Sequence, residues 1–403
     1  MPRTSNRPRL LIAVNSSIAT GFLQGQPEYF QNAGFDVTVV CPERRVGEWE
    51  VAQPDTVRKV AVPIAREISP LRDIFSTLRL CSVLRALRPT ITNVGTPKAG
   101  LLGGFAAWLN RVPCRFYTLH GLRFETTRGL RRKILIFAER LACRFAHRVV
   151  CVSHSVREKA IGYGLIDREH SLILGAGSCN GIDMSRYIPT PERVKRAAEL
   201  RDSFKIPKGA PVILFVGRLT YDKGICELTR AFLQLEKQIP DIRLLLVGTF
   251  EEGDPLPQEI RNRLETHERV ILAGPVNDPA PYYAISDVLV LPSHREGLPT
   301  VVLEAHAAGK AVVGAAVTGI VDLVVHGETG LLFPVGSVSA LSGAIATLVT
   351  NKTLASKLGR AGQEQVRRNF RQETIWDGMH REYLNVLRRE NRQRPSILSQ
   401  PQN

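Results

Sequence analysis

Two glutamates, Glu296 and Glu304, are separated by seven residues in the segment 293–305. An apolar run at 287–291 precedes this segment and predicts a buried strand, whereas residues 301–308 predict a helix. Glu296 is therefore expected in a loop and Glu304 early on the helix. Carboxylates that follow a parallel strand in this way face the crevice at the carboxyl edge of its sheet.

The backbone between the two glutamates offers a second kind of chemistry. The N–H groups at the start of a helix have no intrahelical partner and suit an anion such as phosphate. The residues expected there are Gly297, Leu298, Pro299 and Thr300. Carboxylates for sugar hydroxyls beside amides for a diphosphate indicate a nucleotide-sugar site. The alternative is an ordinary surface loop and helix with two solvated glutamates.

Basic side chains follow an earlier strand of the same half of the chain. Arg218 and Lys223 stand in the stretch 215–224, which leads from an apolar run into a helical pattern. An arginine can hold two phosphate oxygens at once, and a lysine adds a compact charge. Gly217 and Gly224 flank these cations and permit close approach of the backbone to a ligand. We therefore interpret this loop as a diphosphate clamp, the alternative being two solvated cations.

The elements that must position these groups alternate along the chain. Buried parallel strands are predicted at 9–14, 36–41, 57–62, 90–94, 114–119 and 148–152, and then at 211–216, 242–247, 269–272, 287–291, 311–314 and 331–333. Helices are predicted between them, among others at 20–34, 71–87, 98–110 and 129–147, with Pro27 interrupting the first, and finally at 336–349, 351–369 and 371–390. This alternation predicts an α/β fold with two doubly wound sheets.

The length of the chain and the positions of its prolines indicate how it divides into domains. A chain of 403 residues suits two α/β domains. Prolines and charges around 183–210 mark the boundary between an N-terminal domain, 1–188, and a C-terminal domain, 189–370. The helix 371–390 is expected to return to the first domain, and 391–403 to form a disordered tail.

Composition limits the class of protein. Apolar residues make up 44% and charged residues 23%, as in soluble globular proteins. No apolar run approaches the ~20 residues of a membrane span, and residues 10–14 are too few for a signal-peptide core, so we expect a cytoplasmic protein. The seven cysteines show no C-x-x-C spacing and are interpreted as reduced core thiols.

The charge of the chain is large and uneven. The formal net charge is +16; residues 1–190 carry 27 basic and 14 acidic residues, and residues 191–403 carry 27 and 24. A basic excess on one half implies an anionic partner there: nucleic acid, an anionic membrane surface or a diphosphate-bearing substrate. A well-solvated basic surface is the alternative.

Several catalytic patterns are missing from the sequence. No aspartate has another aspartate two positions away, and there is no H-E-x-x-H, G-x-S-x-G or Walker lysine motif. The stretch 175–181 has the glycines of a dinucleotide loop but leads into a turn and not a helix. We therefore expect no metal and no cofactor.

Taken together, the E-x7-E spacing of Glu296 and Glu304 and the clamp of Arg218 and Lys223 resemble retaining glycosyltransferases of family 4, which have the GT-B fold. The resemblance spans roughly residues 9–385. It implies two Rossmann-like domains that face each other across a cleft. It also implies that the substrate is a nucleotide sugar, most plainly a UDP-sugar, whose ribose is held by Glu304 and whose diphosphate is held by Arg218 and Lys223. Glu296 would orient the transferred sugar, helped by the amides from Gly297 to Thr300.

Two blocks of the N-terminal half carry the rest of the resemblance. Residues 93–100 and 117–127 follow predicted strands, and His120-Gly121 matches the family's H-G motif, which implies that His120 meets the donor sugar. Lys98 and Arg123, with Ser16 and Ser17 after the first strand, are expected on the acceptor side. These blocks resemble family members that use lipid-diphosphate-linked sugars, such as undecaprenyl carriers, in bacterial surface-polysaccharide and protein-glycan assembly; the donor implied is a UDP-sugar such as a UDP-N-acetylhexosamine.

A basic amphipathic segment, residues 129–144, suggests where such an enzyme works. Arg131, Arg132 and Lys133 stand at its start. Its apolar stripe, Leu130, Ile134, Phe137 and Leu141, is expected to pack mostly on the sheet and leave the cations outward. We therefore predict peripheral docking on the inner face of the cytoplasmic membrane through these cations.

Two other classes of protein stay open. One is a non-transferase enzyme of the same fold, such as a UDP-sugar epimerase. The other is a non-enzymatic basic protein that binds nucleic acid, although the aromatic content of 6% and the lack of a binding module argue against a nucleic-acid partner.

Overall fold

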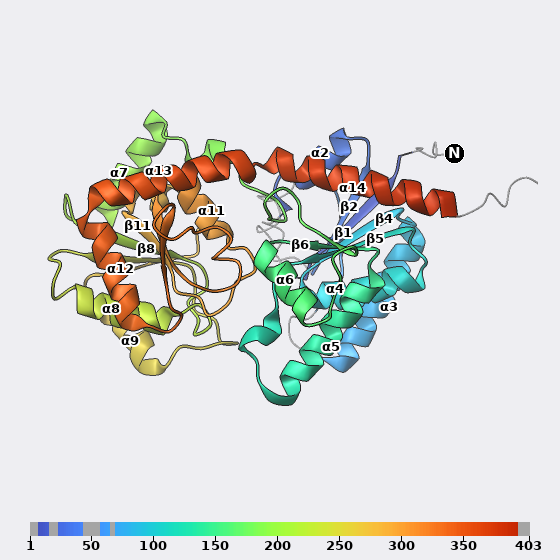
Figure 1. Ribbon diagram of the computed structural model, residues 1–403, viewed down its shortest axis with the longest axis horizontal. Helices are drawn as coiled ribbons and strands as arrows, with labels where there is room; N and C mark the ends of the chain where they lie inside the picture. The colour runs from blue at the N-terminus through green and yellow to red at the C-terminus, as the bar shows by residue number, and fades with distance from the viewer. Residues whose placement is uncertain (1–6, 16–22, 43–56, 65–68, 394–403) are drawn as a thin grey trace, which may run out of the picture. The chain divides into compact units, whose positions relative to one another are not determined.

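The structure is a computed structural model that describes residues 7–15, 23–42, 57–64 and 69–393. The chain forms two compact units (Figure 1). Unit 1 comprises Met1–Gly181 and Gln372–Asn403, and unit 2 comprises Ile182–Arg371. The sequence placed the first boundary slightly later, after residue 188.

Unit 1 is built on a sheet of seven parallel strands in the order β3-β2-β1-β4-β5-β6-β7. The strands are β1 (Arg9–Ala13), β2 (Asp36–Cys41), β3 (Arg58–Ala61), β4 (Ile91–Gly95), β5 (Cys114–Leu119), β6 (Arg148–Cys151) and β7 (Ser171–Leu172). The central strands β1, β4 and β5 are almost wholly buried, as their continuous apolar runs predict. The strand order reverses between β1 and β4, which makes this the topological switch point of the sheet.

The helices of unit 1 lie between these strands. They are α2 (Gln26–Asn32), α3 (Pro70–Leu87), α4 (Pro97–Leu109), α5 (Gly129–Phe145), α6 (His154–Gly162) and α14 (Gln372–Gln393), with the short 3-10 helix η2 (Arg123–Thr126). Pro27 lies in the first turn of α2, where its missing N–H costs no helical hydrogen bond. Among the described residues of the predicted helix 20–34, the helix begins at Gln26.

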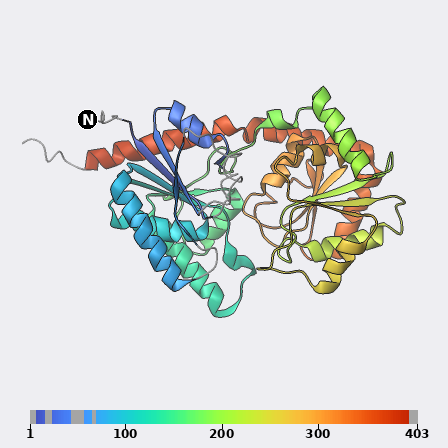
Figure 2. The same ribbon diagram turned by 180° about the vertical axis from the view of Figure 1, so that it is seen from behind.

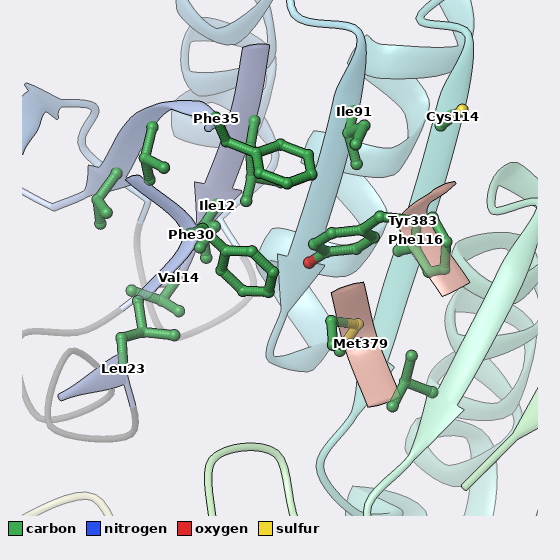
Figure 3. Close-up of a cluster of buried hydrophobic side chains, with 14 of the residues drawn as sticks. Ile12, Val14, Leu23, Phe30, Phe35, Ile91, Cys114, Phe116, Met379 and Tyr383 are labelled. Atoms are coloured by element: carbon green, nitrogen blue, oxygen red, sulfur yellow. The ribbon is translucent and has the colours of Figure 1, made fainter. Parts of the chain in front are cut away.

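The last long helix, α14, completes the core of unit 1. Figure 3 shows Tyr383 and Met379 among the buried side chains of the sheet and of α2. The ring of Tyr383 lies 5.3 Å from that of Phe30 and 4.9 Å from that of Phe116. Its hydroxyl accepts a hydrogen bond of 2.8 Å from the side-chain amide of Asn93. The C-terminal helix is thus part of the N-terminal sheet's core, and it runs to Gln393.

Unit 2 repeats the architecture with six parallel strands in the order β10-β9-β8-β11-β12-β13. The strands are β8 (Val212–Val216), β9 (Arg243–Val247), β10 (Val270–Gly274), β11 (Val288–Leu291), β12 (Ala311–Ala315) and β13 (Gly330–Phe333). The helices are α7 (Pro191–Ser203), α8 (Ile225–Leu235), α9 (Gln258–Thr266), α10 (Ala280–Ile285), α11 (Thr300–Ala307), α12 (Val338–Thr350) and α13 (Lys352–Asn369), with η3 (Met184–Tyr187). The α/β fold with two doubly wound sheets is thereby confirmed.

The segment 183–210 is more ordered than its prolines and charges suggested. Its middle part forms α7, which Thr190 caps by accepting a hydrogen bond from the backbone N–H of Arg193. Pro191 stands in the first turn, where a proline is tolerated. Pro191 thus begins a helix of unit 2, and the segment is not an irregular linker.

One prediction about α5 is wrong. Leu130, Ile134 and Phe137 do not pack on the sheet but are exposed, at 73%, 47% and 60%. The buried face carries Glu139, Ala142 and Cys143 instead. Glu139 can turn inward because its carboxylate accepts a hydrogen bond of 2.5 Å from the hydroxyl of Tyr117 in β5. A buried acid with a buried partner therefore reverses the orientation that hydrophobicity alone predicted.

All seven cysteines lie within the described residues and are free thiols. Six are buried and Cys179 is partly exposed, in keeping with their interpretation as reduced core residues. Across the described stretches, none of the helices combines the length and apolar character needed to cross a bilayer.

Candidate active site

The switch point of unit 2 brings two predicted motifs to one edge of the sheet. The strand order reverses between β8 and β11, which are neighbours. The loop after β8 contains Arg218 and Lys223, and the loop after β11 contains Glu296. Loops at such a point diverge and leave a crevice in which ligands bind.

The backbones of these loops touch, and glycine makes this possible. Gly224 has a φ of +71°, and a Cβ there would lie 2.1 Å from the carbonyl oxygen of Pro292. Gly319, with a φ of +81°, likewise faces the carbonyl oxygen of Gly297 at 2.3 Å. No other residue fits at either position without moving the backbone. Gly224 therefore sets the distance between the two motifs, and Gly319, which follows β12, lets a third loop approach the segment with Glu296.

Lys223 and Glu296 form an ion pair. The Nζ of Lys223 lies 2.5 Å from Oε1 of Glu296, and their side chains are only 18% and 12% exposed. The pair joins Lys223, which is predicted to bind the diphosphate, to Glu296, which is predicted to orient the transferred sugar. Neither the E-x7-E spacing nor the clamp pattern alone indicated that these two residues meet.

Arg218 binds a carboxylate that the sequence analysis missed. Its Nη1 lies 2.6 Å from Oε2 of Glu251, which follows β9. The two loops run side by side, since the N–H of Leu219 donates to the carbonyl of Thr249. Glu251 could have been found by the same rule as the others, because it follows the carboxyl end of a buried aliphatic strand.

A further group of charges holds the β8 and β11 loops together. Arg295 pairs with Asp222 at 2.9 Å, and Nε2 of His294 lies 3.0 Å from Oε1 of Glu227 on α8. The N–H of His294 also donates to the carbonyl of Asp222. The hydrogen bond with Glu227 raises the pKa of His294 above its usual value. Burial favours a higher pKa for Glu227, but hydrogen bonds from His294 and from the backbone outweigh it and lower that pKa.

Glu304 has different surroundings. It lies in the middle of α11, and its Oε2 accepts a hydrogen bond of 2.7 Å from the hydroxyl of Tyr283 on α10. Tyr187 of η3 is a second hydrogen-bonding partner. Burial raises the pKa of Glu304 to about 7, although the tyrosine hydroxyls and the nearby Arg186 oppose this shift. The sequence analysis named none of these three partners.

The start of α11 supplies the amides that the sequence predicted, with one exception. Gly297 and Leu298 precede the helix, Pro299 caps it and Thr300 is its first residue. Pro299 has no N–H, so it shapes the turn but donates nothing to a ligand. Of the four residues named, three have an amide hydrogen to donate.

In unit 1, His120 lies directly after β5, at the carboxyl edge of that sheet. Its ring packs on Gly95, where a Cβ would lie 2.8 Å from Nε2. Burial lowers the pKa of His120 to about 4, so the imidazole is neutral at pH 7. The ring borders a cavity of about 20 Å³, room for one water. Asn93 and Thr118 also line it and are joined by a hydrogen bond of 2.9 Å.

Two more predicted residues of unit 1, Lys98 and Arg123, lie near the same edge. Lys98, in the first turn of α4, pairs with Asp73 of α3 at 2.7 Å. Arg123 begins η2, and its charge acts to lower the pKa of Glu139. Ser16 and Ser17 lie outside the described residues. In the parts of the chain that the structure describes, no group of three or more His, Cys, Asp or Glu side chains is arranged to hold a metal ion.

Of the three cations predicted to dock on a membrane, Arg131 and Lys133 are exposed on the first turn of α5. Arg132 donates a hydrogen bond of 2.8 Å to the hydroxyl of Tyr163 and also lies over its ring. Two of the three cations therefore face solvent, and the third is held against α6.

The structure defines an α/β protein with two doubly wound sheets and paired charges at the switch point of unit 2, and comparison with known proteins makes the class specific. Residues 197–365 match the family described as Glycosyl transferases group 1, and residues 23–177 match the Glycosyl transferase 4-like domain. The chain belongs to the glycosyltransferases of the GT-B fold, family-4 type.

Two relatives and one solved structure illustrate this membership. The capsular polysaccharide biosynthesis glycosyltransferase CapM of Staphylococcus aureus is 31% identical over 94% of this chain and 97% of its own length. An Escherichia coli UDP-Gal:α-D-GlcNAc-diphosphoundecaprenol α-1,3-galactosyltransferase is 27% identical over 81% of this chain and 83% of its own. Anabaena HepE in complex with UDP and glucose superimposes with a TM-score of 0.79, at 20% identity, over 94% of this chain and all of that one.

Proposed function

We propose that this chain is a retaining glycosyltransferase of bacterial surface-glycan assembly. It moves a sugar from a UDP-sugar, such as a UDP-N-acetylhexosamine, to a sugar carried on a lipid diphosphate. The E. coli relative, whose name states a UDP-sugar donor and a diphosphoundecaprenol acceptor, supports both substrate classes. The S. aureus relative supports the pathway.

The observation that carries the proposal is the ion pair of Lys223 and Glu296 at the switch point of unit 2. A diphosphate that enters this crevice offers Lys223 an anion in place of the carboxylate. Glu296 is then released to accept hydrogen bonds from the hydroxyls of the transferred sugar. Arg218 makes the same exchange, from Glu251 to the diphosphate.

In the reaction, the bond between the anomeric carbon and the diphosphate oxygen breaks, and the acceptor hydroxyl forms the new bond and gives up its proton. Negative charge grows on the departing diphosphate. Arg218, Lys223 and the amides of Gly297, Leu298 and Thr300 are placed to stabilise that charge. We propose that these groups suffice without a divalent metal.

His120 has a separate part in this proposal. A neutral imidazole can exchange hydrogen bonds with a sugar hydroxyl without adding a charge to the crevice. Its pKa of about 4 keeps it neutral throughout the physiological range. We assign it to the transferred sugar, while Ser16, Ser17, Lys98 and Arg123 are assigned to the acceptor. A lipid-linked acceptor further implies peripheral work at the inner face of the cytoplasmic membrane.

Product analysis tests the proposal. The purified chain is incubated with radiolabelled UDP-sugars and an undecaprenyl-diphosphate-linked sugar, in chelator and with added magnesium. We expect label in the lipid fraction for one donor, an α-anomer in the product by NMR, and equal rates in both buffers. Conversion of the UDP-sugar to its epimer without acceptor, or turnover only with magnesium, would contradict it.

A variant and its control make the assignment of the site testable. Glu296→Gln keeps the shape of the side chain but removes its charge, and we expect label transfer to be lost. Lys357, an exposed residue of α13, supplies the control: Lys357→Ala should transfer label as the unaltered chain does. Transfer at the normal rate by Glu296→Gln would remove the carboxylate from the mechanism.

A further inference from the structure

An apolar surface lies on two helices of unit 1. The connections through α3, α4 and α5 all run in the same direction along the sheet, so right-handed crossovers put these helices on one face of it. Figures 1 and 2 show them side by side along unit 1. The surface consists of exposed side chains from the N-terminal halves of α3 and α5: Leu71, Ile74, Phe75, Leu78, Leu130, Ile134 and Phe137.

The spacing of these side chains makes two continuous stripes. On α3 they recur at i, i+3, i+4 and i+7, and Leu71 and Phe75 are 84% and 60% exposed. Among the described residues, ten of the eighteen large apolar side chains that are exposed belong to α3, α4 and α5. Such a concentration on one face marks an interaction site and not the scattered exposure of an ordinary surface.

The charges around this apolar surface have one sign. Arg72 and Arg79 on α3, and Arg131, Lys133 and Arg140 on α5, are exposed. The three helices hold only two acidic residues, and both turn away from solvent. Asp73 is paired with Lys98, and Glu139 is buried against Tyr117.

We propose that this surface inserts its apolar side chains into the interface of an anionic lipid bilayer, with the surrounding cations at the level of the head groups. Exposed apolar stripes beside basic residues are the features by which helices lie in a membrane interface. The inference rests on the proposed function, since a lipid-linked acceptor must be met at a bilayer. It differs from docking through Arg131, Arg132 and Lys133 alone, because the apolar side chains contribute as well.

The surface adjoins the residues assigned to the acceptor. The pair of Lys98 and Asp73 ties the first turn of α4 to the first turn of α3. Lys98 also follows β4 at the carboxyl edge of the sheet. A bilayer that contacts the N-terminal halves of α3 and α5 therefore lies beside the edge where a lipid diphosphate would be held.

A second copy of this chain is a poorer occupant of the surface. A symmetric dimer would bring the same patch from both copies together. Arg72, Arg131 and Lys133 of one copy would then face the same cations of the other, with no exposed acidic residue from these helices between them. Anionic head groups offer the opposite charge, so the bilayer is favoured.

The test uses vesicles that contain no acceptor, so that it does not depend on catalysis. The full chain is co-sedimented with neutral vesicles and with vesicles containing one third phosphatidylglycerol, at low and high salt. We expect binding to the anionic vesicles, weakened but not abolished by salt. The charge variant Arg72→Gln/Arg131→Gln/Lys133→Gln should lose roughly 100-fold at low salt, about fivefold per cation.

The apolar contribution is measured separately. The variant Leu130→Ser/Ile134→Ser/Phe137→Ser should bind at least about tenfold more weakly at both salt concentrations, because buried apolar area is not screened by ions. Its matched control, Ile188→Ser/Val194→Ser, removes exposed apolar side chains of unit 2 and should bind as the unaltered chain does. UDP affinity and circular dichroism, measured on each variant, check that unit 2 and the fold are intact.

The outcomes distinguish a wrong docking surface from a wrong proposed function. If the apolar variant binds vesicles normally while its UDP affinity is normal, the docking surface is wrong and the proposed function stands. If vesicle binding follows the expectation but no donor is ever transferred, the surface stands and the proposed function fails. Concentration-dependent dimers that the apolar variant abolishes, with no vesicle binding, would assign the surface to a second copy.

Discussion

The carboxyl edges of the two sheets have the same topology and opposite chemistry. The edge of unit 2 is a set of charges joined in pairs: Lys223 with Glu296, Arg218 with Glu251, Arg295 with Asp222, and His294 with Glu227. The edge of unit 1 has neutral groups near its switch point, namely the imidazole of His120 and the hydrogen-bonded side chains of Asn93 and Thr118. The same fold therefore presents paired charges near one switch point and uncharged hydrogen-bonding groups near the other.

The two edges differ in the contacts that a ligand would have to displace in order to bind. In unit 2 the partly buried cations already have carboxylates, which lowers the cost of keeping them out of water. A diphosphate bound as we propose would displace those carboxylates, and part of its binding energy would be spent on the exchange. In unit 1 the side chain of Asn93 is held by Tyr383 of α14, so its orientation is set before any ligand arrives.

Removing the amine of Lys223 is the strongest test of the charged edge. Lys223→Ala should lower turnover roughly 10²–10³-fold, the scale seen when one stabiliser of a developing charge is removed. The measurement is the initial rate of label transfer at saturating donor. Lys357→Ala, on the exposed surface of α13, serves as the control. A loss of less than fivefold would show that the leaving diphosphate does not depend on this cation.

The partner of that lysine should behave differently. Glu296→Gln should also lower turnover strongly, because the carboxylate meets the transferred sugar. It should not weaken UDP binding, since Lys223 is then released for the phosphate. Calorimetry with UDP and rate measurements on the same preparation separate the two effects. If UDP affinity fell as far as turnover, Glu296 would be assigned to the nucleotide.

Arg218 should contribute to the affinity for UDP. Arg218→Ala should weaken UDP binding by about 1.5–3 kcal/mol, the value of a hydrogen bond to a charged group. Calorimetric titration with UDP measures this loss. Unaltered affinity for UDP would mean that Arg218 pairs only with Glu251 and that other residues bind the diphosphate.

The sequence predicted the strands and the residues that follow them, because buried aliphatic runs and strand ends are local properties. It named Arg218, Lys223 and Glu296 in this way, whereas His120 was named from the resemblance of its H-G motif to the family. It could not supply the pairing of Lys223 with Glu296, because that contact depends on β8 and β11 being neighbours. In the sequence, 71 residues lie between the end of β8 at Val216 and the start of β11 at Val288. Contacts across the sheet are set by strand order, which periodicity does not contain.

Other errors have particular causes. The two-residue strand β7 is too short to give a pattern. The prediction for the apolar stripe of α5 was wrong because Glu139 is buried, where its carboxylate accepts a hydrogen bond from Tyr117. Helical periodicity does not reveal such a contact. Tyr283, which holds Glu304, stands in a six-residue helix with no charge to draw attention to it.

Glu304 makes the charged edge sensitive to pH. Its pKa in the fold, about 7, lies above its ordinary value of 4.5, so protonation is favoured by folding. The stabilisation is complete below pH 4.5 and is lost as pH rises through 7. The ionised form accepts from ribose, however, so uridine affinity should fall about tenfold from pH 8 to pH 6. Uridine itself does not titrate there, and Glu304→Gln should give a flat profile; a flat profile in the unaltered chain would contradict the ribose assignment.

The smallest effect concerns Glu251, whose carboxylate competes with the diphosphate for Arg218. Glu251→Gln should strengthen UDP binding by up to about 1 kcal/mol, since pairs of this exposure contribute little. Its neighbour Glu252 is exposed and provides the matched control: Glu252→Gln should leave UDP affinity unchanged. Calorimetry at low salt gives the best resolution. Weaker binding by Glu251→Gln would reverse the interpretation, because the carboxylate would then position Arg218 for the ligand and not compete with it.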